Sequence, residues 1–91
     1  MIIGKVVGSV ISTRKNDALL GSKFLIVESL FNNGAETPQR IVAVDNVGAG
    51  IQELVLVATG SAARVGTGNE GAPVDACIVG IIDDPSKIYC E

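Results

Sequence analysis

Short apolar runs separated by turn-forming residues make up most of the chain, and this pattern predicts an all-β domain. Eleven glycines and three prolines interrupt runs that are rich in Val, Ile and Leu, as in domains built from short strands. Five runs have this character, and they cover residues 2–13, 23–31, 40–45, 53–59 and 74–83. We therefore expect five strands arranged in a small barrel or sandwich.

Residues within and between the runs predict how the chain turns. Gly4 and Gly8 interrupt the first run and suit a bend or a β-bulge, by which small barrels turn corners. The Asn-Asn-Gly sequence at 32–34 predicts a tight turn, because Asn and Gly accept the positive φ that hairpin turns require. After the fourth run, residues 61–66 predict a helix of one or two turns, capped by its first residue, Ser61, and stopped by its final glycine.

The last two runs are apolar on both faces, which a sheet with one solvated face would not show. In the fourth run Leu54, Leu56 and Ala58 alternate with Val55 and Val57. In the fifth run one expected face holds Val74, Ala76, Ile78 and Ile82, and the other holds Cys77, Val79 and Ile81. Parallel sheets beneath crossover helices are also buried on both faces, but 91 residues leave no room for such helices. Burial against other subunits explains the pattern better, so we expect an oligomer.

Composition narrows the class of protein further. A chain of 91 residues is expected to form one domain spanning 1–91. A net charge of -3 argues against a nucleic-acid partner, because such partners are bound largely through Lys and Arg. No apolar run approaches the roughly 18 residues that a membrane span requires, so no membrane partner is expected. Two cysteines in so apolar a chain make no disulfide framework and indicate a reduced, cytosolic protein.

No group of residues predicts catalysis. The chain has no histidine, the commonest general base and metal ligand, and Cys77 is expected to be a buried, inert thiol. Residues 66–71 match the glycine pattern of dinucleotide-binding loops, but they follow the expected helix and precede a strand, which reverses the order that such a site needs. A surface loop is the better interpretation. We therefore predict no enzyme activity, no metal and no cofactor.

Three segments of the chain carry a specific combination of residues, in a specific order. They are Val44–Gly50, Gly60–Arg64 and Pro73–Ala76 leading into Val79–Asp83. Together they resemble the bacterial microcompartment vertex protein family, the EutN/CcmL type, and the resemblance covers nearly the whole chain. It implies a small closed five-stranded OB-like β-barrel with one short helix, assembling as a cyclic homopentamer.

The resemblance also implies a structural function. Pentamers of this family cap the vertices of a carboxysome or metabolosome shell in the bacterial cytoplasm, and hexameric shell proteins tile the rest of that shell. A narrow central pore would pass small solutes. The type of microcompartment stays open.

Candidate residues for the subunit interface or the pore lie in the same segments. Small side chains at 48–50 and 61–63 permit close approach of backbones around an axis, although an ordinary tight loop and a plain helix turn would explain them equally. Arg64 and Asp75 would either form a charge-assisted pair or remain two solvated charges. The full set of candidates is Asp45, Asn46, Gly48, Ala49, Gly50, Ser61, Ala62, Ala63, Arg64 and Asp75.

The alternative function is a small oligomeric OB-like module that binds an oligosaccharide, a nucleic acid or a peptide. Barrels that bind single strands rely on aromatic stacking platforms and a positive groove. This chain has two Phe, one Tyr and no Trp, and its net charge is negative. Oligomeric state separates the two functions, because a vertex protein must form a five-fold ring.

Overall fold

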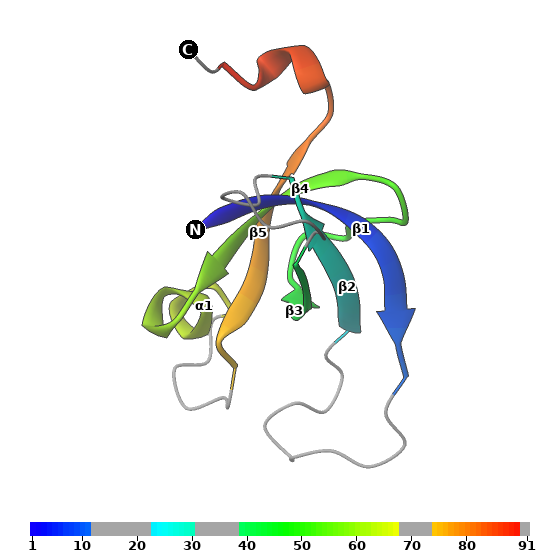
Figure 1. The fold of residues 1–91 in the computed structure, drawn as a ribbon. Helices are drawn as coiled ribbons and strands as arrows, with labels where there is room; N and C mark the ends of the chain where they lie inside the picture. The colour runs from blue at the N-terminus through cyan, green and yellow to red at the C-terminus, as the bar shows by residue number, and fades with distance from the viewer. Residues whose placement is uncertain (12–22, 31–38, 68–73, 90–91) are drawn as a thin grey trace.

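The chain folds into a closed β-barrel with one short helix packed on its outside (Figure 1). The computed structural model describes residues 1–11, 23–30, 39–67 and 74–89. Its elements are β1 (Ile2–Val10), β2 (Lys23–Ser29), β3 (Arg40–Asp45), β4 (Leu54–Thr59), α1 (Ser61–Gly66), β5 (Ala76–Ile82) and the 3-10 turn η2 (Pro85–Lys87). Each strand lies within one of the five predicted runs, so the expected all-β barrel is confirmed.

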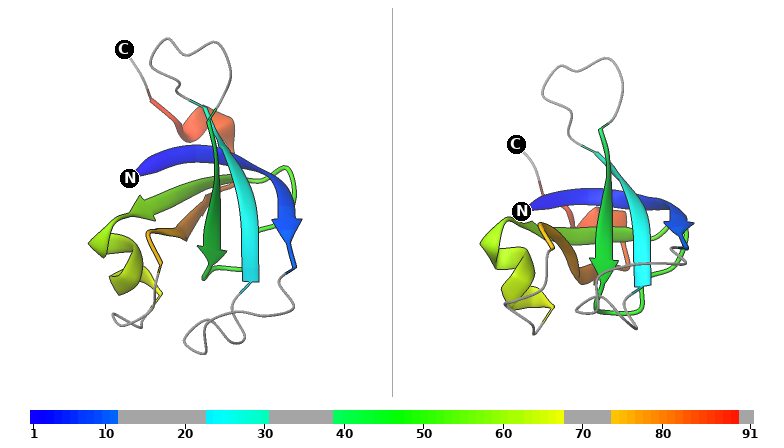
Figure 2. Two further views of the ribbon diagram at one scale, coloured as in Figure 1. Left: turned by 60° about the horizontal axis from the view of Figure 1, so that its bottom comes forward. Right: turned by 90° about the horizontal axis from the view of Figure 1, so that it is seen from below.

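The strands close in the order β1-β2-β3-β5-β4. β1 is long enough to pair antiparallel with β2 and also with β4. The parallel pairing of β3 with β5 is the shortest, and it consists of Val44 with Cys77 and Asp45 with Ile78. Figure 2 shows the barrel from two further directions, with α1 outside its wall.

The interior of the barrel is filled by aliphatic side chains from alternate strand positions. Its buried members are Val6, Leu25, Val27, Ala43, Ala49, Val55, Val57, Ala76 and Ile78. A narrow barrel leaves little interior space, and β-branched and small residues fill it at native density without strain.

A second cluster lies outside the barrel wall, beneath α1. Val44, Ala63, Val74 and Cys77 are buried in it, and Phe24 and Val79 pack against them. The predicted burial of both faces of the fifth run is therefore confirmed for Cys77. Its cause is corrected, because the helix of the same chain, and not another subunit, covers this face.

Bulges in β1 and β5 alter the expected alternation of faces. Gly80 pairs with Leu56 and Ile78 with Val57, so Val79 is an extra residue in β5. The bulge turns Ile81 toward the barrel core beside Ile78, whereas the plain alternation had placed Ile82, and not Ile81, on the face of Ile78. In β1 the register shifts between Val6 and Gly8, which confirms the irregularity predicted from the glycines.

Two local predictions are corrected and two lie outside the described residues. Gly60, with φ 65°, precedes the helix where Ser61 was expected to cap it, and no side chain of the described residues caps α1. Val74 was expected in the fifth strand on the same face as Ala76 and Ile78, but it precedes β5 and packs beneath the helix. The expected turn at 32–34 and most of the 66–71 loop are outside the described part of the chain.

An alanine at Gly4 is expected to destabilise the barrel. A Cβ there would lie 2.8 Å from the backbone oxygen of Glu28 and would collide with Cγ1 of Val27. Since Gly4 pairs with β2 at this point, the backbone cannot retreat without breaking the sheet. We expect Gly4→Ala to lower the free energy of unfolding by about 1 to 3 kcal/mol, measured by urea denaturation.

The control is Gly8→Ala. The nearest atom to a Cβ at Gly8 is Cδ1 of Ile26 at 3.3 Å, the end of a side chain that can rotate away. Gly8→Ala should therefore cost less than Gly4→Ala, and equal losses would contradict the proposed collision.

Candidate functional site

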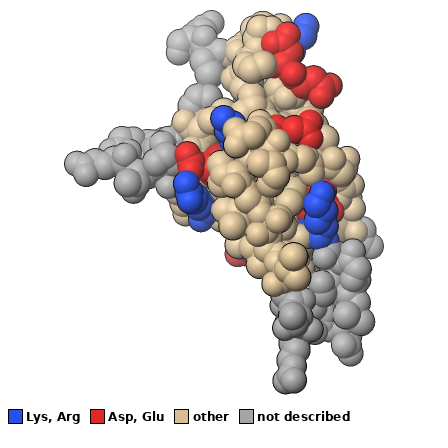
Figure 3. Space-filling model, turned by 90° about the vertical axis from the view of Figure 1, so that its right-hand side faces the viewer, with Lys and Arg blue, Asp and Glu red and all other residues tan. Residues whose placement is uncertain are grey.

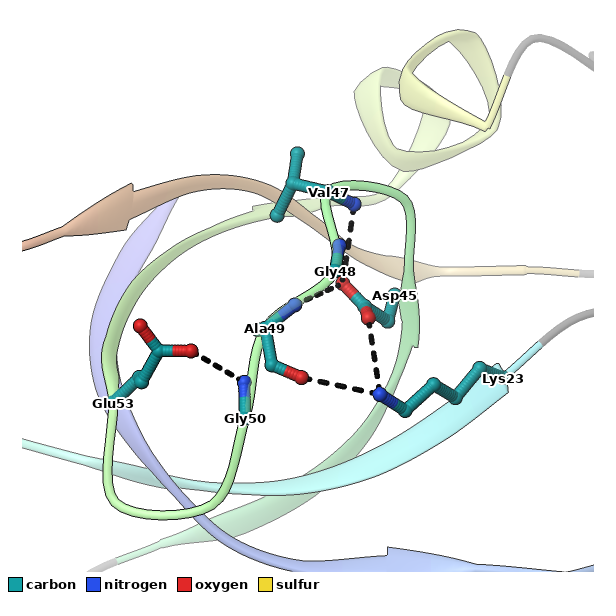
Figure 4. A network of polar contacts seen from close by, with 7 residues as sticks. All are labelled: Lys23, Asp45, Val47, Gly48, Ala49, Gly50 and Glu53. Carbon is teal, nitrogen blue, oxygen red and sulfur yellow. Dashed lines mark hydrogen bonds and ion pairs between the residues drawn. The ribbon is translucent and has the colours of Figure 1, made fainter.

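The loop that follows β3 is organised around one carboxylate (Figure 4). Asp45 Oδ1 accepts hydrogen bonds from the backbone N–H groups of Val47 and Gly48 at 3.1 Å and of Ala49 at 3.2 Å. Gly48 has φ 80°, a conformation that favours glycine. Three amides aimed at one oxygen hold the loop in a single tight turn.

A lysine from β2 completes this network. Lys23 Nζ lies 3.7 Å from Asp45 Oδ2 and donates to the backbone oxygen of Ala49 at 3.2 Å. The Asp45 side chain is 2% exposed, so its charge is compensated by the lysine and by the three amides. Glu53 closes the far side of the loop by accepting the N–H of Gly50 at 2.6 Å. The loop is therefore preorganised by its own chain.

Asn46 connects this loop to the helix. Its Nδ2 donates to the backbone oxygen of Gly66, the last residue of α1. Two of the segments singled out in the sequence, 44–50 and 60–64, thus belong to one continuous region of the surface. A side-chain amide that donates to a helix carbonyl also satisfies one acceptor left over at the helix end.

The candidate interface residues divide into exposed and buried ones. The exposed residues are Asn46, Gly48, Ser61, Ala62 and Asp75, and Gly50 is half-buried. Ala49 is 1% exposed in the barrel core and Ala63 is 0% exposed beneath α1. Packing within the subunit accounts for the small side chains at these two positions, and their place at an interface or a pore stays a prediction.

Asp75 lies next to the start of the helix. Its backbone oxygen accepts the N–H of Gly60 at 2.9 Å. The Arg64 side chain is outside the described part of the structure, so its pairing with Asp75 stays a prediction.

The list of candidate residues missed the apolar outer surface of β1, β4 and β5. Ile3 pairs with Leu56 and Leu54 with Ile82, and all four side chains are half-buried on the outside of the wall. A hollow of about 590 Å³ lies over part of this surface, beneath Ile88 and Tyr89 of the C-terminal segment. The double apolar alternation of the fourth run was the sequence signal for it.

The distribution of charge on the surface is uneven. Figure 3 shows one face with a continuous uncharged area, and the charged side chains gather toward its margins. The ion pair of Arg40 with Glu28, with Nε and Oε2 2.9 Å apart, bridges β3 and β2. An uncharged area bordered by charges is typical of surfaces that meet other proteins.

The described residues offer little reactive chemistry. Burial, with a smaller contribution from the charge of Asp45, raises the pKa of the Cys77 thiol, which keeps it in its less reactive protonated form. Hydrogen bonds from Ser86 lower the pKa of Asp84 at the start of η2. No three His, Cys, Asp or Glu side chains of the described residues gather as a metal site would require. Among those same residues, no helix is long and apolar enough to span a membrane.

Comparison with known proteins decides the family. The family model described as ethanolamine utilisation protein EutN/carboxysome matches residues 1–83. The chain belongs to the EutN/CcmL family. Family membership confirms the resemblance carried by the 44–50, 60–64 and 73–83 segments.

Relatives named as shell vertex proteins match nearly the full length of the chain. The carboxysome shell vertex protein CcmL of Gloeobacter violaceus is 48% identical, over 94% of this chain and 86% of its own. The bacterial microcompartment shell vertex protein GrpN of Rhodospirillum rubrum is 46% identical, over 91% of this chain and 93% of its own.

Solved structures of the family share the fold. An ethanolamine utilization protein, EutN, aligns with a TM-score of 0.82 at 40% identity, over 92% of this chain and 88% of its own. The GrpN pentameric microcompartment shell protein from Rhodospirillum rubrum aligns with a TM-score of 0.77 at 42% identity, over 92% of this chain and 95% of its own.

Removing the carboxylate of Asp45 is expected to loosen the loop and destabilise the barrel. Asp45→Ala leaves three backbone amides without their acceptor, and we expect a loss of about 2 to 4 kcal/mol in unfolding free energy. Hydrogen exchange of the amides at 47–49 should accelerate. Asp83→Ala is the control, since Asp83 is exposed and has no ion pair among the described residues; unchanged exchange at 47–49 in Asp45→Ala would refute the role assigned to Asp45.

A charge at two adjacent alanines of α1 should change the stability of the subunit by very different amounts. Ala63→Glu buries a carboxylate among Val44, Val74 and Cys77, and we expect about 3 to 5 kcal/mol of destabilisation. Ala62→Glu lies on the exposed side of the helix and should change the stability of an unassembled subunit by no more than about 0.5 kcal/mol. Thermal unfolding of both variants, at a dilution at which each is monomeric, checks this. A stable Ala63→Glu subunit would contradict the intrachain burial.

Proposed function

We propose that this protein is a non-catalytic shell protein that forms homopentamers and caps the vertices of a bacterial microcompartment. The observation that carries the proposal is similarity along nearly the whole chain to proteins named shell vertex proteins, at 48% and 46% identity. The likeness to a solved structure titled as a pentameric shell protein supports the five-fold state. Its place would be the shell of a microcompartment within the bacterial cytoplasm.

The surface of the subunit supports an assembling role. Ile3, Leu54, Leu56 and Ile82 give the outer wall an apolar area that no other element of the described chain covers fully. A single 91-residue domain gains little from burial within itself, so contact with other copies adds a substantial part of its stabilisation. A closed ring uses two different faces of each subunit, and the apolar wall can supply one of them.

The preorganised loop suits a position close to a symmetry axis. Its amides are already bound by Asp45 and Glu53, so five copies could approach without leaving backbone groups unpaired. We infer that the exposed residues Asn46, Gly48, Ser61 and Ala62 lie at or near the interface or the pore.

The proposal includes hexameric shell proteins as partners and excludes nucleic acid. Five-fold rings supply the curvature that flat hexagonal tiling lacks, so a vertex protein needs such tiles around it. The chain carries seven basic against ten acidic residues, which gives phosphate backbones little to bind.

Native mass spectrometry tests the five-fold state. We expect a dominant species of about five times the 9.3 kDa mass of one chain. When an oligonucleotide or an oligosaccharide is added, we expect no complex of the protein with either ligand. A monomer at micromolar concentration would refute the pentamer, and specific binding of either ligand would favour the OB-like binding module.

Shell closure tests the role itself. Co-expressed with hexameric shell proteins, the chain should yield closed particles that retain a small enclosed solute. Without it, the particles should be open or elongated, because hexagonal sheets alone do not close, and they should leak. Closed particles that retain the solute both with and without the chain would refute the vertex function.

A further inference from the structure

The C-terminal residues 83–89 leave the barrel as an arm (Figure 1). Asp84 Oδ1 accepts the N–H of Ser86 at 2.9 Å, and the N–H of Ile88 donates to the backbone oxygen of Pro85 at 3.1 Å. The arm is thus shaped by its own hydrogen bonds. Ile88 has extended backbone angles, φ -93° and ψ 116°, and Tyr89 is 85% exposed.

A hollow of about 510 Å³ lies at the opposite end of β5. Its lining consists of Ile41, Val42, Thr59, Gly60, Asp75 and Ala76. β5 pairs with β3 only at Val44 and Asp45, so no strand of the described residues pairs with the preceding part of β3 on that side. Val42 on this part is 52% exposed.

The arm of a subunit cannot fill the hollow of that same subunit. Ala76 lies at the hollow, and the arm begins just after Ile82 at the other end of β5. Six steps along a strand span about 20 Å, and Lys87, Ile88 and Tyr89 line a different hollow, together with Ile3 and Leu56 of their own barrel. None of the described residues of the arm therefore fills the hollow at Val42.

The arm and the hollow complement each other in charge and in shape. Lys87 and Asp75 are both exposed, and neither makes an ion pair with another described residue. Ile88 carries an apolar side chain that suits the part of β3 with which no other described strand pairs on that side. Tyr89 brings an apolar ring for Val42 and a hydroxyl for a carboxylate, and such aromatic side chains anchor many protein interfaces.

We propose that the arm of each copy docks in the hollow of the next copy around the ring. Lys87 would pair with the carboxylate of the neighbour's Asp75, and Ile88 and Tyr89 would cover Val42 and the β3 edge. The contact is head-to-tail, with one arm and one hollow per copy, as a closed ring requires. This inference rests on the proposed function, since it assigns the contact that joins neighbours in the pentamer.

The single tyrosine of the chain provides a direct test on the unmodified protein. With one Tyr and no Trp in the sequence, intrinsic fluorescence reports on Tyr89 alone. In pentamers verified by native mass spectrometry, we expect acrylamide to quench it about threefold less than it quenches N-acetyltyrosinamide, because an interface anchor is shielded from solvent. Quenching equal to that of the free compound in intact pentamers would overturn the arm contact and leave the proposed function standing.

Two matched variants test the hollow. Val42 is 52% exposed and Val10, at the end of β1, is 38% exposed, and Val10 is not part of the hollow lining. We expect Val42→Glu to raise the apparent dissociation constant of the ring about 30-fold or more, the effect of losing an interface anchor, and Val10→Glu to leave it unchanged. A ring unaffected by Val42→Glu would overturn the proposal.

A charge exchange identifies the partner residues. Lys87→Asp and Asp75→Lys should each weaken the ring, and the double variant should recover most of the loss, because it restores an opposite pair. Two additive losses would overturn the Lys87–Asp75 pairing. If the unmodified protein is a monomer, both the pentamer and the arm contact are refuted. If the ring is intact but Tyr89 is accessible to the quencher, only the arm contact is refuted.

Discussion

The barrel closes through two residue pairs, Val44 with Cys77 and Asp45 with Ile78, and much of the molecule serves to support that short contact. Two parallel pairs contribute little by themselves. On the outside of the barrel, Ala63 of α1 packs in one buried cluster with Val44 and Cys77. At the end of β3, the Asp45 carboxylate fixes the next turn through three amides and Lys23. Apolar burial and one charge network thus hold the closure together from two sides.

The same short contact leaves part of the wall incomplete. Where β3 and β5 diverge, Val42 is 52% exposed, and no strand of the described residues covers the neighbouring backbone edge. An isolated protein would be expected to protect such an edge, because exposed edges recruit other chains. Docking of a neighbouring copy's arm, as we propose, would cover this edge. The apolar wall of β1, β4 and β5 follows the same logic, since a small domain gains from other copies what it cannot bury by itself.

Among the described residues, Cys77 and Asp45 both have structural roles. Cys77 supports the closure by packing beneath α1, and burial raises its pKa. Asp45 is nearly buried and is bound on both oxygens, so its charge holds a loop in place. The Asp45 carboxylate and Lys23 thus make the backbone of the loop after β3 rigid.

The sequence by itself determined the class of fold, the number of strands, the position of the helix and the family. These follow from local causes: apolar runs bounded by glycine, a short segment of helix formers, and motifs that are contiguous in the chain. Whether a side chain is buried depends on distant partners, and only the tertiary structure decided it. Ala62 and Ala63 are neighbouring alanines of α1, but Ala62 is exposed, whereas Ala63 is on the buried side of the helix.

Alternation along a strand also has a limit. It placed Ile82 on the face of Ile78, because a period of two has no means of expressing the extra residue at Val79, which only the register with β4 shows. Likewise, the double apolar pattern of β5 indicated a cover without identifying it. The helix of the same chain covers Cys77. Val42 is exposed because the pairing of β3 with β5 is limited to Val44 and Asp45, and the sequence of neither strand shows where this pairing begins.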